Sequence, residues 1–165
     1  MAAAPPPPPS TVAPLVVGRP NVLDAKGFLE DVASILESRL LTNGGPFVVR
    51  LEAAAAEYLG VAHCVAVCNA TAGLELALKA LNVAPGSDVL VPSFTFVATA
   101  HAVRNAGLVP VFADVDEDSH CVTPETLAAA ATPNTKAVLA AHLWGGAGDA
   151  AALDAYCASH EWRVL

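Results

Sequence analysis

The sequence predicts an α/β fold in which a mostly parallel sheet is covered by helices on both faces. From Cys64 onward, short apolar runs alternate with helix-like segments of about ten residues, the order typical of βαβ units. The apolar runs are continuous, as in strands that are buried on both faces. Hydrophobic residues make up 55% of the 165 residues and charged residues 15%, so the chain has enough apolar surface for a core.

Residues 1–17 differ from the rest in composition. They include the run Pro5–Pro9, which favours an extended polyproline segment, and they have neither the basic nor the apolar region of a secretory signal. No apolar run approaches the length of about 20 residues that a membrane-spanning helix needs. We therefore expect a disordered tail over residues 1–17, a folded part over 18–165, and no membrane partner.

Two helices are expected before the alternation begins. Asp24–Leu40 has apolar residues at helical spacing. The turn residues 42–47 interrupt this pattern, and a second helix over Val49–Tyr58 is closed by Gly60, because glycine readily adopts the left-handed conformation of a helix C-cap.

The remaining elements are predicted from apolar runs and from the residues that begin or end helices. Thr123 is expected to cap a helix with Pro124 at its first position, and Gly107 ends the helix before it. Strands are expected at Cys64–Val67, Val89–Val91, Pro110–Val115, Ala137–His142 and Trp162–Leu165, and helices at Ala72–Leu81, Thr95–Asn105, Thr123–Ala131 and Asp149–Ser159.

Charge and cysteine content limit the function classes. The formal net charge is −8 and the basic residues form no stripe, which disfavours nucleic acid as a partner. The four cysteines lack the spacing of a metal site, and we expect them to be small buried thiols in a reducing, cytoplasmic compartment.

Ligands of open α/β sheets lie at the carboxyl ends of the strands, and four such ends can be read from the sequence. In the first, Thr71 is expected to cap a helix that begins at Ala72, while small neighbours leave the first amides open to an anion; the loop fits either a phosphate cup or a plain capped helix. The other three ends are Pro92–Phe96, Asp114–Asp118 and His142–Gly146.

Each of these three ends has two interpretations. Phe94 and Phe96 fit either a ring that covers a flat cofactor or two core aromatics. The carboxylates of Asp114–Asp118 favour a solvated turn over a cation site, so no metal is predicted. His142 fits a ligand-facing histidine as well as a structural one.

Together the motifs resemble one family. The order GPFVVRLEAAAAEYLGV, CNATAGLELALKAL, PGSDVLVPSFTFVATAHAV, GLVPVFADVD, TPNTKAVLAAHLWGG is similar to the amino-terminal half of the DegT/StrS-type nucleotide-sugar aminotransferases. The resemblance implies the aspartate-aminotransferase fold, with residues 18–165 as an incomplete amino-terminal part of the large domain that binds pyridoxal 5′-phosphate (PLP). It also implies a nucleotide-linked keto-sugar as substrate, a glutamate-type amino donor and a homodimer.

The resemblance assigns roles to matching residues. Thr71 and Ala72 match the pair that binds the PLP phosphate, and Phe96 matches the aromatic residue that stacks on the pyridine ring. We expect the cofactor site also to include Ala70 and Gly73, which are small and let an anion approach the backbone, and His142, which lies at the strand end where the family has a histidine. The loop at Gly45 and Pro46 matches the part of the family that lies near the sugar nucleotide.

The resemblance also implies what the chain lacks. The Schiff-base lysine of the family and the aspartate that pairs with the pyridinium nitrogen match no residue here, because Lys26, Lys79 and Lys136 occupy other positions. We therefore expect a fragment without catalytic residues of its own. Two alternatives stay open: a PLP-dependent sugar dehydratase, in which histidine replaces the lysine, and a non-catalytic truncated product that is either unstable or pairs with a full-length homologue.

Overall fold

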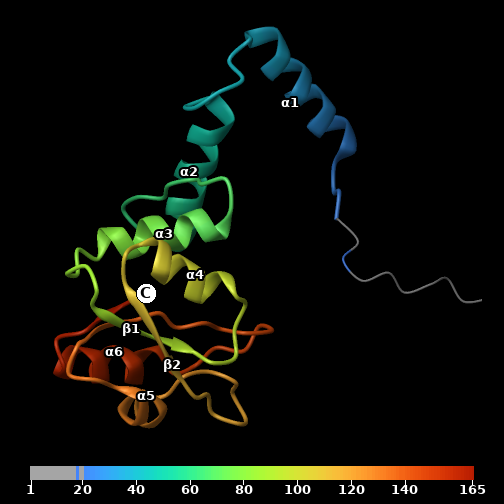
Figure 1. The fold of residues 1–165 in the computed structure, drawn as a ribbon. Coiled ribbons are helices and arrows are strands. Elements are labelled where there is room, and N and C mark those ends of the chain that lie inside the picture. The colour runs from blue at the N-terminus through green and yellow to red at the C-terminus, as the bar shows by residue number, and fades with distance from the viewer. Residues whose placement is uncertain (1–17, 19–20) are drawn as a thin grey trace, which may run out of the picture. The chain divides into compact units, whose positions relative to one another are not determined.

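The computed structural model describes residue 18 and residues 21–165, so the tail expected over 1–17 lies outside the described residues (Figure 1). The chain divides into two compact units. The first extends to Cys64, and the second comprises Val65–Leu165. Within the described part of the chain, none of the helices has the length and apolar character that crossing a membrane requires.

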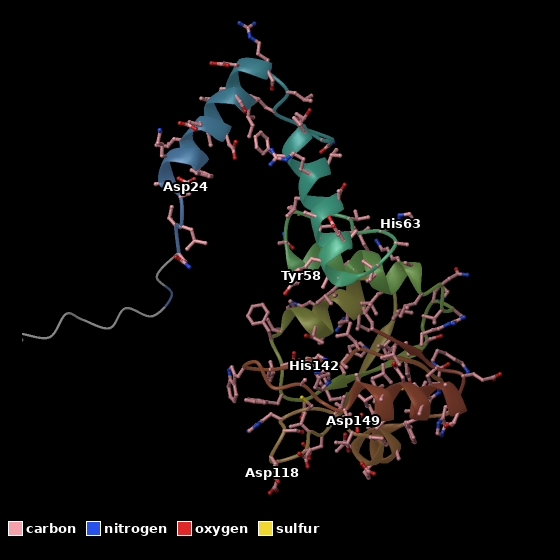
Figure 2. All side chains as sticks on the ribbon, turned by 180° about the vertical axis from the view of Figure 1, so that it is seen from behind. Asp24, Tyr58, His63, Asp118, His142 and Asp149 are labelled. Carbon is pink, nitrogen blue, oxygen red and sulfur yellow. The ribbon has the colours of Figure 1, made fainter. Side chains whose placement is uncertain are left out.

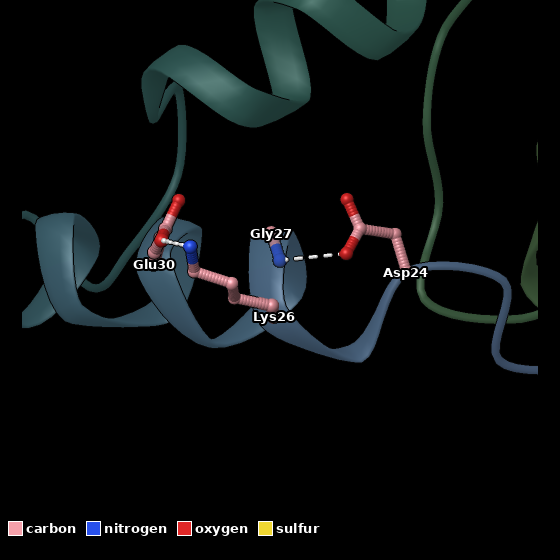
Figure 3. Close-up of polar contacts among 4 residues, drawn as sticks. All are labelled: Asp24, Lys26, Gly27 and Glu30. Atoms are coloured by element: carbon pink, nitrogen blue, oxygen red, sulfur yellow. Dashed lines mark hydrogen bonds and ion pairs between the residues drawn. The ribbon is translucent and has the colours of Figure 1, made fainter.

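The first unit begins with helix α1 (Ala25–Ser38), which confirms the first predicted helix. Asp24 is its N-cap, and the carboxylate accepts a hydrogen bond of 2.9 Å from the amide of Gly27 (Figure 3). One turn further, Lys26 and Glu30 form an exposed i,i+4 ion pair with an N–O distance of 3.7 Å. The helix ends at Arg39, whose left-handed backbone stops the α-helical hydrogen bonding.

Helix α2 (Pro46–Leu59) begins three residues before the predicted start at Val49. Proline suits the first helical position, because its fixed φ is helical and its missing N–H has no intrahelical acceptor there. Gly45, with φ −64° and ψ 156°, is the extended N-cap, and Gly60, with φ 66°, ends the helix as predicted. Pro46 therefore belongs to a helix and not to a loop.

The second unit contains a four-stranded sheet in the order β2-β1-β3-β4, and every pair of neighbours is parallel. The predicted fold class is therefore confirmed. The strands are β1 (Asp88–Pro92), β2 (Val109–Ala113), β3 (Thr135–Val138) and β4 (Arg163–Val164).

Helices cover both faces of this sheet. Figure 1 shows α3 (Ala70–Ala80) and α4 (Ala98–Asn105) on one face, and α5 (Pro124–Ala130) and α6 (Ala150–Ser159) on the other. The central strand β1 divides its side chains between the two. Val89 and Val91 pack into the core under α3 and α4, and Leu90 packs into the core over α5 and α6. Because both faces are buried, the strands have continuous apolar sequences.

The four cysteines of the chain differ in burial. Cys121 and Cys157 are buried, and burial raises the pKa of the Cys157 thiol, which keeps that thiol protonated. The expectation that all four are buried is wrong for Cys68, which is exposed, and Cys64 is only partly buried.

Three predicted boundaries are wrong for identifiable reasons. No strand forms over Cys64–Val67, where Val65 is 74% exposed, because no strand in the described residues pairs with it. Helix α4 begins at Ala98 and not at Thr95. Strand β3 ends at Val138, although Leu139 and Ala140 still donate backbone hydrogen bonds to Leu90 and Leu165.

A polar network at the amino-terminal edge of the sheet joins the start of β1 to the loop before β3. The hydroxyl of Thr132 donates to the carboxylate of Asp88 at 2.6 Å and accepts from the amide of Asn134 at 3.1 Å. Both contacts are lost in Thr132→Val. We expect this change to lower the free energy of unfolding by about 1–2 kcal/mol in urea titrations.

Ser159→Ala is the matched control for this prediction. The hydroxyl of Ser159 is exposed and bonds only within its own helix end, to Tyr156 and His160. Its removal should change the free energy of unfolding by less than about 0.5 kcal/mol. Equal effects of the two variants would contradict the role given to the Asp88–Thr132 network.

Candidate functional site

The carboxyl ends of β1, β2 and β3 meet at one edge of the sheet, since the three strands are parallel. The loops that follow are 93–97, 114–123 and 139–149, so the topology brings three of the predicted ligand-facing segments together. Helix α3 runs opposite to β1 in Figure 1, which places its amino end on the side where β1 ends. The fourth segment, Asn69–Gly73, therefore lies at the same edge.

Asn69 is the N-cap of α3. Its side-chain oxygen accepts from the amide of Ala72 at 2.9 Å, and its carbonyl oxygen accepts from the amide of Gly73 at 3.1 Å. The prediction that Thr71 caps the helix is wrong, because the helix begins at Ala70 and Thr71 already belongs to its first turn. Its hydroxyl is therefore not used by the cap.

This arrangement leaves unpaired donors at the amino end of α3. In the described part of the chain, no acceptor bonds the amides of Ala70 and Thr71 or the hydroxyl of Thr71. The helix dipole adds partial positive charge at this end. A Cβ atom on Gly73 would lie 3.3 Å from Val67 Cγ2, so a larger residue there would press on the preceding segment. The amino end of α3 thus presents unpaired N–H and O–H donors in a narrow space, an arrangement that suits a phosphate.

Rings from three loops meet at the same edge, in a group that we call the aromatic cluster: Phe94, His120 and Trp144. The ring centroids are 5.3 Å apart for Phe94 and Trp144, 5.5 Å for His120 and Trp144, and 5.8 Å for Phe94 and His120. Phe96 lies outside the cluster and is 74% exposed, so neither phenylalanine is a core aromatic. Sequence reasoning did not find this group, whose only sequence signal is one aromatic or histidine residue in each of three strand-end loops.

The acidic loop after β2 is organised by its own backbone. The carboxylate of Asp116 accepts from the amides of Ser119 at 2.8 Å and Asp118 at 3.3 Å, and these bonds to Ser119 and Asp118 hold the pKa of Asp116 below its usual 3.8. Asp118 lies at the outer end of the loop (Figure 2). In the described residues, no group of three metal-ligating side chains forms here or elsewhere.

The depressed pKa of Asp116 leads to a prediction about acid stability. Because the folded-state pKa is below the unfolded value, the stabilisation is present above about pH 4 and is lost as the pH falls through the folded pKa. In Asp116→Asn, the melting temperature should therefore fall less steeply than in the parent between about pH 4 and pH 2. Asp118→Asn is the control, since in the described residues the Asp118 carboxylate accepts none of the hydrogen bonds of this loop, whereas Asp116 accepts two. An equal change in slope would contradict the prediction.

His142 holds the loop after β3. Its Nδ1 atom accepts from the amide of Gly148 at 3.1 Å, so the neutral ring carries its proton on Nε2. A Cβ atom on Gly148 would lie 3.0 Å from the Cβ of Cys121, so the loop packs closely on the loop after β2. The exposed ring also borders a hollow of about 160 Å³ with Leu153 and Leu165. His142 thus uses Nδ1 for a structural contact, and its other ring nitrogen, Nε2, does not take part in that contact.

The lysines of the second unit are not at this edge. Lys79 is exposed on α3, and Glu75, one turn before it, accepts a hydrogen bond of 2.6 Å from Asn105. Lys136 lies on β3 among residues of the opposite, amino-terminal edge, including Ser87 and Arg163. Gly45 and Pro46 belong to the first unit, where they border an apolar hollow of about 200 Å³ with Ile35 and Leu40.

Known proteins similar to this chain include aminotransferases. The chain is 42% identical over 147 residues to a UDP-N-acetyl-3-dehydro-α-D-glucosamine 3-aminotransferase of Acidithiobacillus ferrooxidans, covering 89% of this chain and 38% of the relative. It is 40% identical to an L-glutamine:2-deoxy-scyllo-inosose aminotransferase of Streptomyces lividus, covering 86% of this chain and 35% of the relative. The chain thus spans less than two fifths of the length of these relatives.

Solved structures agree. DesI, whose crystal structure was determined in the presence of its TDP-sugar product, superposes with a TM-score of 0.84 at 46% identity, covering 92% of this chain and 38% of DesI. An E. coli GDP-4-keto-6-deoxy-D-mannose-3-dehydratase with bound hydrated PLP matches with a TM-score of 0.78 at 22% identity, which shows the shared fold alone. A sequence model of one family matches residues 23–165. The chain belongs to the DegT/DnrJ/EryC1/StrS aminotransferase family.

Proposed function

We propose that the whole protein transfers an amino group from a glutamate-type donor to a keto-sugar carried on a nucleotide, with PLP as cofactor. Family membership supports the reaction class, and the names of two similar proteins, which mention a UDP-linked and a TDP-linked sugar, support the substrate class. We further propose that it acts in the cytoplasm as a homodimer. This chain contributes the part that holds the cofactor phosphate and one face of its ring.

The open donors at the amino end of α3 are the observation that carries this proposal. The amides of Ala70 and Thr71 and the hydroxyl of Thr71 fit a phosphate dianion in number and charge. Ala72 and Gly73 are small, so a phosphate can approach the backbone. These residues therefore fit the phosphate of PLP. The amide of Ala72, which was expected to bind the phosphate as well, is already bonded to the side chain of Asn69.

Phe96 and His142 of this edge belong to the proposed cofactor site, and a separate proposal concerns Gly45 and Pro46 of the first unit. The exposed ring of Phe96 offers a flat face for the pyridine ring and excludes water from it. His142 is positioned by Gly148 and keeps its Nε2–H for a ligand. Gly45 and Pro46 are proposed to lie near the sugar nucleotide. When bound, PLP supplies the electron sink that stabilises negative charge at the amino-bearing carbon.

The chain by itself is proposed to be inactive. Transamination with PLP needs a lysine at the reacting carbon, which moves the proton. Neither Lys79 nor Lys136 is at the carboxyl edge of the sheet, and Lys26 is on α1 in the first unit. The residues of this chain thus bind and orient the cofactor, and the proton-transfer group belongs to the longer protein.

Titration of the purified chain with PLP, followed by absorbance, tests this function. We expect reversible binding that inorganic phosphate displaces, no fixation to the chain by borohydride, and no amino transfer with glutamate and a nucleotide-linked keto-sugar. Binding that phosphate does not displace would contradict the cup at Ala70 and Thr71. Turnover by the chain, or a lysine modified after borohydride treatment, would contradict the proposed division of roles.

A further inference from the structure

The backbone at Trp144 is strained although its side chain is not buried. The residue has φ 53°, in the left-handed region that bulky side chains rarely adopt, and its side chain is 80% exposed. A conformation of this kind is unfavourable and persists only where the surrounding structure holds it, as at many ligand-binding sites. The indole is exposed, so its burial cannot offset the cost of the strained backbone. The strained backbone at an exposed side chain points to a role in contacting a ligand.

The surrounding loops hold Trp144 in place. Phe94 and His120 contact the indole at steep interplanar angles of 76° and 64°, and with 80% of the side chain exposed most of the indole surface stays open. The amide of Gly146 donates to the carbonyl oxygen of Leu143 at 2.9 Å, which closes a turn around the tryptophan. On the other side of the cluster, His120 donates its backbone N–H to the carbonyl oxygen of Asp116, also at 2.9 Å. The aromatic cluster is therefore a preorganised surface.

We propose that the open face of Trp144, backed by Phe94 and His120, binds the planar base of the nucleotide to which the sugar substrate is attached. This inference rests on the proposed function, because it assigns a place to one part of the proposed substrate. Stacking suits a flat, neutral base, and the cluster lies at the sheet edge where ligands of this fold class bind. The assignment makes Trp144 a substrate-positioning residue.

The charge around the cluster decides which part of a nucleotide binds there. The loop that supplies His120 also has the carboxylates of Asp114, Asp116, Glu117 and Asp118. The low pKa of Asp116 keeps that carboxylate ionised at neutral pH. Negative charge repels a diphosphate, so the diphosphate must extend away from this loop and the uncharged base is the part that fits.

Nuclear magnetic resonance of the whole chain tests the proposal directly. The chain has two tryptophans, which give two indole N–H signals. Trp162 is the internal reference, because it lies just before β4 at the amino-terminal edge and contacts Tyr156 and His160. We expect uridine and uridine diphosphate to shift the Trp144 signal and to leave the Trp162 signal in place, whereas pyrophosphate and ribose 5-phosphate shift neither.

Variants then separate binding from folding. Trp144→Gly removes the ring and relieves the strained backbone, so it should weaken uridine binding about tenfold or more without lowering the melting temperature. Trp144→Phe keeps an aromatic face and should retain binding within about threefold. Unchanged uridine binding by Trp144→Gly would overturn the proposal. If Trp144→Gly is instead markedly less stable, normal uridine binding by Trp144→Ala would overturn it.

Two further outcomes would also overturn it. A Trp144 signal that responds to pyrophosphate as strongly as to uridine diphosphate would assign the surface to phosphate. A signal that moves with protein concentration and not with uridine would assign the cluster to contact between copies of the chain. The uridine titration contains no PLP and should be unaffected by Thr71→Val, so failure of base binding and failure of the phosphate cup are distinguished.

Discussion

Replacing Leu90 with alanine is expected to lower the free energy of unfolding by about 3 kcal/mol. Leu90 is in the central strand β1, has 0% exposed surface and packs with Leu127 and Leu153 between the sheet and helices α5 and α6. Truncation removes apolar contacts and leaves a cavity that neighbours on a rigid sheet fill only in part. Urea unfolding followed by circular dichroism measures the change.

Leu76→Ala is the matched control for this core substitution. Leu76 is in helix α3 and 55% exposed, so the same truncation removes little buried surface there. Alanine also has the higher helix propensity, and the expected change is within about 0.5 kcal/mol of zero. A loss at Leu76 as large as the loss at Leu90 would show that β1 is not the centre of the core.

Replacing Ala70 with proline is expected to weaken PLP binding by about tenfold or more while leaving stability unchanged. Ala70 is the first residue of α3, where proline is tolerated, and the preceding Asn69 has the extended backbone, φ −164° and ψ 165°, that a following proline requires. The substitution removes one N–H donor, and a hydrogen bond to a charged group stabilises by about 1.5–3 kcal/mol. Competition between PLP and inorganic phosphate measures the loss.

Ala150→Pro is the control for the loss of this donor. Ala150 is the first residue of α6, and its N-cap Asp149 accepts from Ala152 at 2.9 Å, as Asn69 accepts from Ala72 at the same distance. Proline at position 150 should leave PLP affinity within about twofold of the parent. If both variants bind equally weakly, a general effect of proline and not the open amide of Ala70 explains the result.

Helix starts and ends that depend on neighbouring residues alone were predicted from the sequence. Thr123 and Pro124 begin α5, and Thr123 forms a reciprocal capping box with Thr126. Gly60 ends α2 with a left-handed backbone. At α3 two capping residues compete, and the rule that favours Asn, Ser or Thr did not distinguish Asn69 from Thr71.

Features that depend on distant segments were not predicted. Whether Cys64–Val67 pairs as a strand depends on a neighbour that its own sequence does not specify. The aromatic cluster requires the order β2-β1-β3, because only then do the loops with Phe94, His120 and Trp144 follow adjacent strands. The family resemblance placed Thr71 and Phe96 at the cofactor, but it did not indicate that Asn69 already occupies the amide of Ala72.

The strand order also determines where the fold tolerates change. From β1 the chain leaves toward α4 on one face and returns to β2, whereas from β3 it leaves toward α6 on the other face and continues to β4. The reversal makes the boundary between β1 and β3 a topological switch point, because the connections after these two strands lead to opposite faces of the sheet. Substitutions in the loops after β1 and β3 can therefore alter ligand preference while the hydrogen-bonded ladder between these strands stays intact.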